Sequence, residues 1–197
     1  MKAEYPIHAE RSGRHIHLSP AHFAALFGPG VEPHIFKPLS QEGIFAAVET
    51  VTLEYTNGRQ LKKVRVLGPL RPYTQIEIST TDAYNLGMDP LPPIRLSGNL
   101  AGSPGIKVIG PCGQIILETG VIIAQRHLHV GPEEAAHYHL KNNDVVAIRI
   151  ASPRGGTLEN VVVRVADKPC CAFHLDSDEA NAMGIVTGTI VELIRRE

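Results

Sequence analysis

Short runs rich in Val, Ile and Thr recur along the chain, and long stretches with helical periodicity do not. Eighteen glycines and fifteen prolines separate these runs. β-Branched residues favour strands, whereas Gly and Pro favour turns. The pattern therefore predicts a mainly β chain with short helices, of the kind found in barrels and sandwiches.

A similar pair of strands is predicted in each half of the chain. Asn57-Gly58, a dipeptide that favours two-residue hairpin turns, separates two apolar runs in the first half. The Pro-Arg-Gly-Gly segment 153–156 separates two similar runs in the second half. The predicted strands are residues 44–55 and 60–67, and residues 144–151 and 157–165.

Short helices are predicted from capping residues. A serine followed by proline suits the start of a helix, because the serine side chain caps the helix and proline fits its first position. An acidic residue three positions after a cap, as in Asp176 and Glu179, completes a capping box. The predicted helices begin near Ser19, Gly131 and Asp176.

A His-x-His unit occurs twice, as Arg-His-Ile-His at 14–17 and as Arg-His-Leu-His at 126–129, and a proline follows each unit three residues on. Alternate side chains of a strand point to the same face, so both imidazoles of a unit can bind one ion. Neutral imidazole is a common zinc ligand. The repetition favours zinc binding by His15, His17, His127 and His129.

A second repeat adds two candidate ligands, because residues 71–87 align without a gap on residues 168–184 and place Glu77 opposite His174. Taken singly, Glu77 could be a solvated strand carboxylate and His174 a hydrogen-bonded core histidine. Because the repeat places Glu77 and His174 at equivalent positions, both are interpreted as metal ligands. Together with the four histidines they give six candidate ligands, enough for two three-ligand sites with open positions.

The repeats predict two small related β-barrels packed about a pseudo-twofold axis, with a metal site at their junction. One domain comprises residues 15–124. The other comprises residues 1–14 and 125–197, so that the N-terminal segment joins the C-terminal half. Residues 29–41, rich in proline and polar side chains, are expected to form a surface excursion.

Composition excludes several classes of function. The 197 residues are 43% hydrophobic and carry a net charge of −1, which offers no polycationic surface for nucleic acid. No stretch approaches the roughly 20 apolar residues of a membrane helix, and no secretory signal is evident at the start. The three cysteines form no disulfide framework. A cytoplasmic protein is expected, in which Cys170 and Cys171 pack rather than bind metal.

The motifs resemble those of one family, the PduL-type phosphate acyltransferases, also called phosphotransacylases or phosphate propanoyltransferases. The resemblance covers nearly the whole chain and implies reversible conversion of acyl-CoA and phosphate to acyl phosphate and CoA. It also implies a two-barrel, two-zinc scaffold unrelated to the larger, metal-free phosphotransacetylases. The matching segments are 13–19, 68–69, 71–77, 94–98, 102–104, 126–129 and 174–182.

The resemblance also implies roles for single residues. One zinc, which can meet the CoA sulfur, would be held by Glu77, His127 and His129. A second, more hydrated zinc would be held by His15, His17 and His174. Arg71 matches the family's phosphate-binding arginine, and its planar fork suits a pair of phosphate oxygens; the alternative is a surface salt bridge. The positions that resemble CoA contacts are Ser12, Lys37, Arg65, Leu67 and Asn181.

A direct mechanism is favoured, in which phosphate held by Arg71 attacks the thioester with zinc assistance. No Ser/His/Asp or Cys/His signature suggests a covalent intermediate, and Ser79 and Ser97 are expected to serve capping and packing. Two alternatives remain open. One is a dizinc hydrolase of esters or thioesters. The other is a noncatalytic scaffold protein whose barrels are joined by structural zinc (a zinc-stapled scaffold).

Cellular placement and assembly are the last expectations. Family members that enter bacterial microcompartments, as in propanediol degradation, carry an amphipathic N-terminal extension. About a dozen residues precede Arg14, and their pattern is not amphipathic. The cytoplasm is therefore expected rather than a microcompartment lumen, with a homodimer as the assembly and no nucleic-acid or membrane partner.

Overall fold

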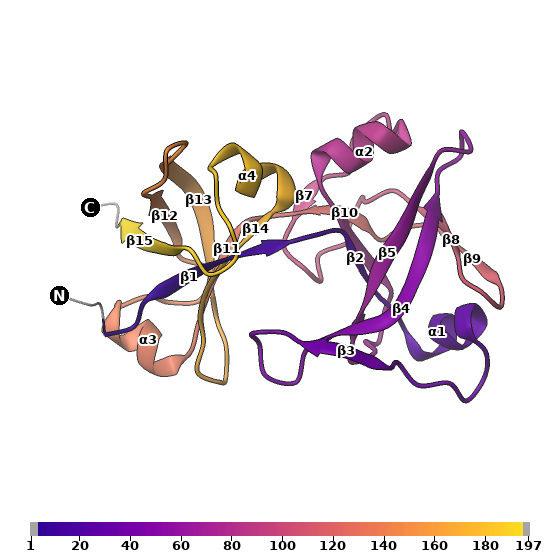
Figure 1. The fold of residues 1–197 in the computed structure, drawn as a ribbon, viewed down its shortest axis with the longest axis horizontal. Helices are drawn as coiled ribbons and strands as arrows, with labels where there is room; N and C mark the ends of the chain where they lie inside the picture. Colours follow the sequence, from indigo (N-terminus) through magenta and orange to yellow (C-terminus); the bar gives the residue numbers. More distant parts are fainter. Residues whose placement is uncertain (1–3, 195–197) are drawn as a thin grey trace. The chain divides into compact units, whose positions relative to one another are not determined.

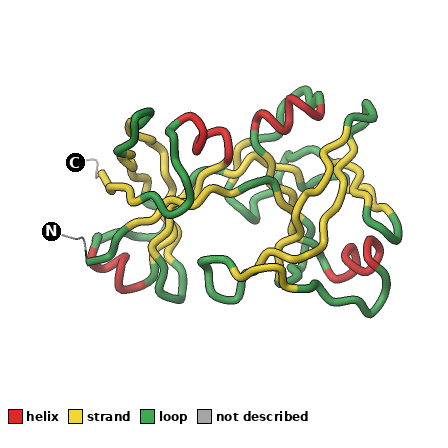
Figure 2. Tube along the Cα trace, in the orientation of Figure 1, coloured by secondary structure: helices red, strands yellow, loops and turns green. Residues whose placement is uncertain are grey.

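The computed structural model describes residues 4–194, in which strands dominate and helices are short (Figures 1 and 2). The prediction of a mainly β chain with short helices is confirmed. The chain divides into two compact units. The barrel unit contains residues 4–13 and 125–194, and the sheet unit contains Arg14–Ala124.

The barrel unit is a closed barrel of six strands in the order β1-β14-β11-β13-β12-β15. β1 closes the barrel, because it pairs in parallel with β14 and antiparallel with β15. Closure leaves no exposed strand edge in this barrel. Its elements are β1 (Ile7–Ser12), β11 (His127–Val130), α3 (Pro132–His137), β12 (Val145–Ile150), β13 (Gly156–Val165), β14 (Cys171–Asp176), α4 (Ser177–Ala182) and β15 (Ile190–Ile194).

Alternate residues of these strands fill the barrel interior. Leu128 and Val130 of β11 are fully buried, and they flank the half-buried His129. Phe173 of β14, also fully buried, faces Leu128 across the antiparallel pair. This alternation explains why the histidines of β11 share the face opposite to the core.

The sheet unit is a twisted nine-stranded sheet in the order β7-β10-β6-β2-β5-β4-β8-β9, with β3 paired to β4 (Figure 1). The short strand β2 lies inside it, parallel to β5 and antiparallel to β6. The elements are β2 (His15–His17), α1 (Pro20–Phe27), β3 (Ile35–Pro38), β4 (Phe45–Glu54), β5 (Gln60–Gly68), β6 (Gln75–Ile78), α2 (Thr80–Leu86), β7 (Ile94–Arg95), β8 (Ile106–Ile109), β9 (Gln114–Leu117) and β10 (Val121–Ala124).

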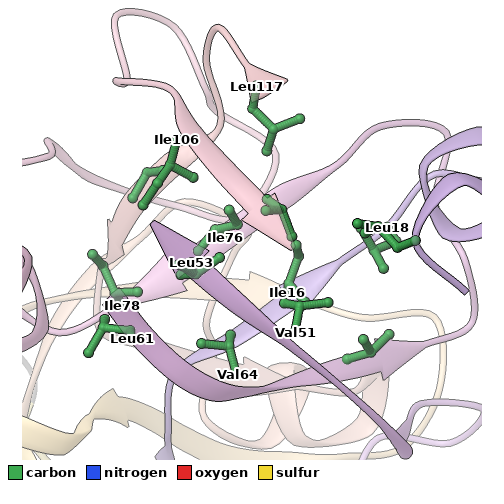
Figure 3. Close-up of a cluster of buried hydrophobic side chains, with 14 of the residues drawn as sticks. Ile16, Leu18, Val51, Leu53, Leu61, Val64, Ile76, Ile78, Ile106 and Leu117 are labelled. Carbon is green, nitrogen blue, oxygen red and sulfur yellow. The ribbon is translucent and has the colours of Figure 1, made fainter. Parts of the chain in front are cut away.

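The core of the sheet unit fixes the register of β2 (Figure 3). Ile16 is fully buried in this core beside Ile76 of β6, to which it is register-paired. Because side chains alternate along a strand, His15 and His17 lie on the other face. A one-residue slip would exchange the faces and move Ile16 out of the apolar core, so that core specifies where the imidazoles point.

The predicted local elements agree with the structure. Ser19 caps α1 by accepting from the His22 backbone N–H, and Asp176 and Glu179 form both halves of a capping box at α4. The four predicted strands correspond to β4, β5, β12 and β13 to within one residue at each end. The excursion 29–41 contains an unpredicted strand, β3, whose four residues are all exposed. No helix among the described residues is long and apolar enough to cross a membrane.

Candidate active site

Strands β2 and β6 bring three predicted metal ligands together in the sheet unit. His15 lies directly opposite Glu77 in the antiparallel pair, with His15 Nε2 3.5 Å from Glu77 Oε2. The ligand atoms of His15, His17 and Glu77 all lie within 4.8 Å of one another. All three residues are buried, so Glu77 is not the solvated strand carboxylate of the alternative interpretation.

The chemistry of this group fits a metal ion. His17 Nδ1 is buried and has no hydrogen-bond partner among the described residues. Burial lowers the pKa of His17 to about 2, and neighbouring His15 and Arg71 contribute to the shift. The imidazole is therefore neutral and keeps the lone pair that a metal needs. A bound cation would give this buried nitrogen a partner.

A corresponding group forms in the barrel unit. His127 Nε2 lies 3.1 Å from His129 Nε2, and the ring of His174 is 5.1 Å from each of the other two rings. His127 Nδ1 lies 2.8 Å from the Gln125 carbonyl oxygen, which favours Nε2 as the ligand atom. Burial lowers the pKa of His129 to about 3, with contributions from His127 and Arg164. The His129 imidazole is therefore neutral as well.

Arg71 lies near the group formed by His15, His17 and Glu77. Its backbone N–H donates to the Leu18 carbonyl oxygen at 2.9 Å, which ties the loop before β6 to the residue that follows β2. The Arg71 charge contributes to the low pKa of His17, so the guanidinium lies within electrostatic range of that ring. Arg71 also donates from an Nη atom to Ser97 Oγ at 3.1 Å. Ser79 caps α2 as expected, whereas Ser97 binds site residues instead of serving capping and packing alone.

Three of the positions that resemble CoA contacts lie in the sheet unit. Parallel pairing places Arg65 beside His15 and Leu67 beside His17. Lys37 is exposed on β3, and the Arg65 guanidinium carbon lies 5.1 Å from the centroid of the Phe36 ring. The other two positions, Ser12 at the end of β1 and Asn181 in α4, lie in the barrel unit.

The two units share a second feature that was not predicted from the sequence. Arg14, immediately before β2, forms an ion pair of 3.0 Å with Asp82, the acidic residue of the α2 capping box. Arg126, immediately before β11, pairs in the same way with Glu179 of the α4 capping box. Each arginine thus links its His-x-His strand to the helix that follows the other ligand-bearing strand. The arginine that precedes His-x-His in both repeats is the sequence feature from which this ion pair could have been predicted.

We expect Arg14→Ala to lower the free energy of unfolding. The Asp82 side chain is only 6% exposed and would lose a charged hydrogen-bond donor. Because the Arg14 side chain is 43% exposed, solvent screens the pair, and we expect the free energy of unfolding to fall by only about 1–2 kcal/mol. Urea denaturation measures the change. Combining Arg14→Ala with Asp82→Asn should then destabilise by less than the sum of the single changes. Full additivity would contradict a role for the pair.

Known proteins resemble this chain over most of its length. Residues 8–186 match the family model described as phosphate propanoyltransferase. A phosphate propanoyltransferase of Rhodobacter capsulatus is 46% identical over 182 residues, covering 92% of this chain and 83% of the relative. One from Salmonella typhimurium is 46% identical over 180 residues, covering 91% and 84%. One from Thermotoga maritima is 46% identical over 184 residues, covering 93% and 86%. The resemblance inferred from the motifs is thereby confirmed, and the chain belongs to the phosphate propanoyltransferase family of acyltransferases.

Proposed function

We propose that the chain transfers an acetyl or propanoyl group reversibly between CoA and inorganic phosphate, with two zinc ions as cofactors. The observation that carries this proposal is the position of Arg71, whose charge reaches a buried group of three potential metal ligands. A hydrolase needs no such phosphate-binding cation, because its nucleophile is water. The cofactors would be held by His15, His17, Glu77, His127, His129 and His174.

Zinc, when bound, would polarise the thioester carbonyl and stabilise the departing thiolate. Arg71 binds two phosphate oxygens through its planar fork and orients a third oxygen toward the carbonyl carbon. Ser97 restrains the Arg71 side chain by accepting one of its hydrogen bonds. As the new C–O bond forms and the C–S bond breaks, acyl phosphate and CoA thiolate result. No acyl-enzyme is required.

Binding of CoA is assigned to Ser12, Lys37, Arg65, Leu67 and Asn181. Arg65 carries its charge on the same face of the sheet as His15, since the two residues are neighbours in a parallel strand pair. Its guanidinium donates to the carbonyl oxygens of Ala47 and Val48 at 2.9 and 2.8 Å, which holds it in place. A fixed cation there suits a phosphate group of CoA.

Some expectations stay predictions. They are the division of the ligands into Glu77, His127 and His129 for one zinc and His15, His17 and His174 for the other, the homodimer, and the cytoplasmic location. The domain boundaries expected from the repeats remain a proposal as well.

The test is an assay of zinc-loaded protein with acetyl-CoA and propanoyl-CoA. Free thiol and acyl phosphate are measured separately, with and without phosphate. We expect equal amounts of the two products, and none without phosphate. Thiol release that ignores phosphate would establish the hydrolase instead, and no release at all would favour the zinc-stapled scaffold. Intersecting lines in a two-substrate kinetic matrix are expected for direct transfer, whereas parallel lines would indicate a covalent intermediate.

A further inference from the structure

A chain of hydrogen bonds connects Glu77 to Arg71 within the sheet unit. Gln75 Nε2 donates to Glu77 Oε1 at 2.6 Å and to Ser97 Oγ at 2.8 Å. An Nη atom of Arg71 donates to the same Ser97 Oγ at 3.1 Å. Gln75 and Ser97, to which the sequence assigned no part in metal or phosphate binding, thus join a candidate metal ligand to the candidate phosphate ligand.

The partners of the Gln75 amide fix its orientation. The Gly98 backbone N–H donates to Gln75 Oε1 at 2.7 Å, and a backbone N–H cannot accept. The nitrogen of the amide must therefore face Glu77 and Ser97, where both of its hydrogens are used. Gln75 is completely buried. A buried amide with these partners holds one conformation, because any rotation would leave a polar atom unsatisfied.

This fixed amide determines which oxygen of Glu77 is available. Gln75 occupies Oε1, and Oε2 is the oxygen that lies 3.5 Å from His15 Nε2. The carboxylate therefore presents one defined oxygen to the histidines. Removing a hydrogen-bond partner that orients a metal ligand in this way commonly lowers the metal affinity by about 10–100-fold.

The barrel unit provides an internal comparison. In the sheet unit Gln75 lies opposite the second histidine of the His-x-His strand, and in the barrel unit Ala172 occupies the equivalent position. The position aligned with Arg71 is Lys168, which lacks a planar fork. A glutamine needed only to build the strand pair would be expected in both units. Its presence where the arginine is present connects it with phosphate binding.

We propose that Gln75 and Ser97 are positioning residues that hold the metal-binding carboxylate of Glu77 and the phosphate-binding guanidinium of Arg71 in a fixed relation. The proposal rests on the proposed function for the role of Arg71. Gln75 acts on both ends of the chain of hydrogen bonds, since it contacts Glu77 and Ser97. Ser97 acts mainly on Arg71. The two residues should therefore differ in what they change.

Three variants separate these roles. Gln75→Met keeps the length of the side chain and removes its hydrogen bonds, and Ser97→Ala removes one hydroxyl. Gln60→Met is the matched control, because Gln60 Nε2 also donates to a carboxylate, that of Glu54, at 2.6 Å, away from the site. Zinc affinity is measured without turnover, by competition with a chromophoric chelator. The KM for phosphate and kcat are measured on zinc-loaded protein.

We expect Gln75→Met to weaken the affinity for one zinc equivalent by about tenfold or more and to raise the KM for phosphate. Ser97→Ala should raise the KM for phosphate by roughly tenfold, as expected for one lost hydrogen bond, with zinc affinity unchanged. Gln60→Met should alter neither quantity. Wild-type zinc affinity in Gln75→Met together with a wild-type KM in Ser97→Ala would overturn the proposal.

Two further outcomes are also decisive. If Gln75→Met does not fold, as judged by circular dichroism, Ser97→Ala decides alone, and an unchanged KM overturns the proposal. If the wild type binds zinc but forms no acyl phosphate, the proposed function fails. A weaker zinc affinity in Gln75→Met would still support positioning of Glu77, whereas an unchanged affinity would overturn it.

Discussion

Replacing Arg71 with alanine is expected to lower kcat/KM for phosphate by about 10²–10³-fold, the usual effect of removing one donor that stabilises developing charge. The Arg71 backbone N–H donates to the Leu18 carbonyl oxygen, and an Nη atom of its guanidinium donates to Ser97 Oγ. An alanine leaves the phosphate without its planar pair of donors. Steady-state kinetics with phosphate as the varied substrate measure the loss.

The specificity of this effect is tested by two further variants. Arg71→Lys keeps the charge without the fork and should recover only part of the activity. Arg59→Ala, at an exposed arginine in the turn before β5, should behave as the wild type. Zinc content should stay the same in all three proteins. An unchanged KM for phosphate in Arg71→Ala would contradict the assignment.

Replacing His17 with alanine is expected to remove one zinc equivalent and to lower kcat by about 10³-fold or more, since Lewis-acid assistance supplies several kcal/mol. His17 is 3% exposed, and its neutral ring has a buried nitrogen suited to a cation. Metal analysis of the purified variant measures the stoichiometry. The same assay used for the wild type measures the rate.

A control for this change is His137→Ala, because His137 is an exposed histidine in α3, outside both histidine groups. It should retain full zinc content and activity. Added zinc in excess should restore little activity to His17→Ala. A fully active His17→Ala protein with its normal zinc content would show that this histidine is not a ligand.

The features predicted from sequence are those set by neighbouring residues. Ser19 and Asp176 cap their helices through backbone groups a few positions away, and the alternation in each His-x-His strand follows from strand geometry. These signals are local and can be found without the fold. The repeat added one long-range prediction, that Glu77 joins the histidines, and it is the residue that the structure brings to His15 and His17.

What escaped prediction depends on contacts between distant segments. Gln75 of β6 meets the loop at Ser97 and Gly98 only because β10 pairs with both β6 and β7, and β7 lies just before that loop. The one indication in the sequence was that Gln75 lies two positions before the candidate ligand Glu77, in a strand that is otherwise apolar. β3 escaped because Pro33 and Pro38 suggested a loop, yet its exposed edge position tolerates proline. The ion pair of Arg14 with Asp82 likewise required the fold.

The place of β1 in the barrel has a consequence for synthesis on the ribosome. Its partners are β14 and β15, and Ala172 pairs with His8. β1 is synthesised before these partners and must wait for them before the ring can close, while the sheet unit, Arg14–Ala124, is complete in between. During that interval β1 is an unpaired strand that could add to another sheet edge. Barrel closure therefore requires contacts of high sequence separation, which general folding physics makes a late step.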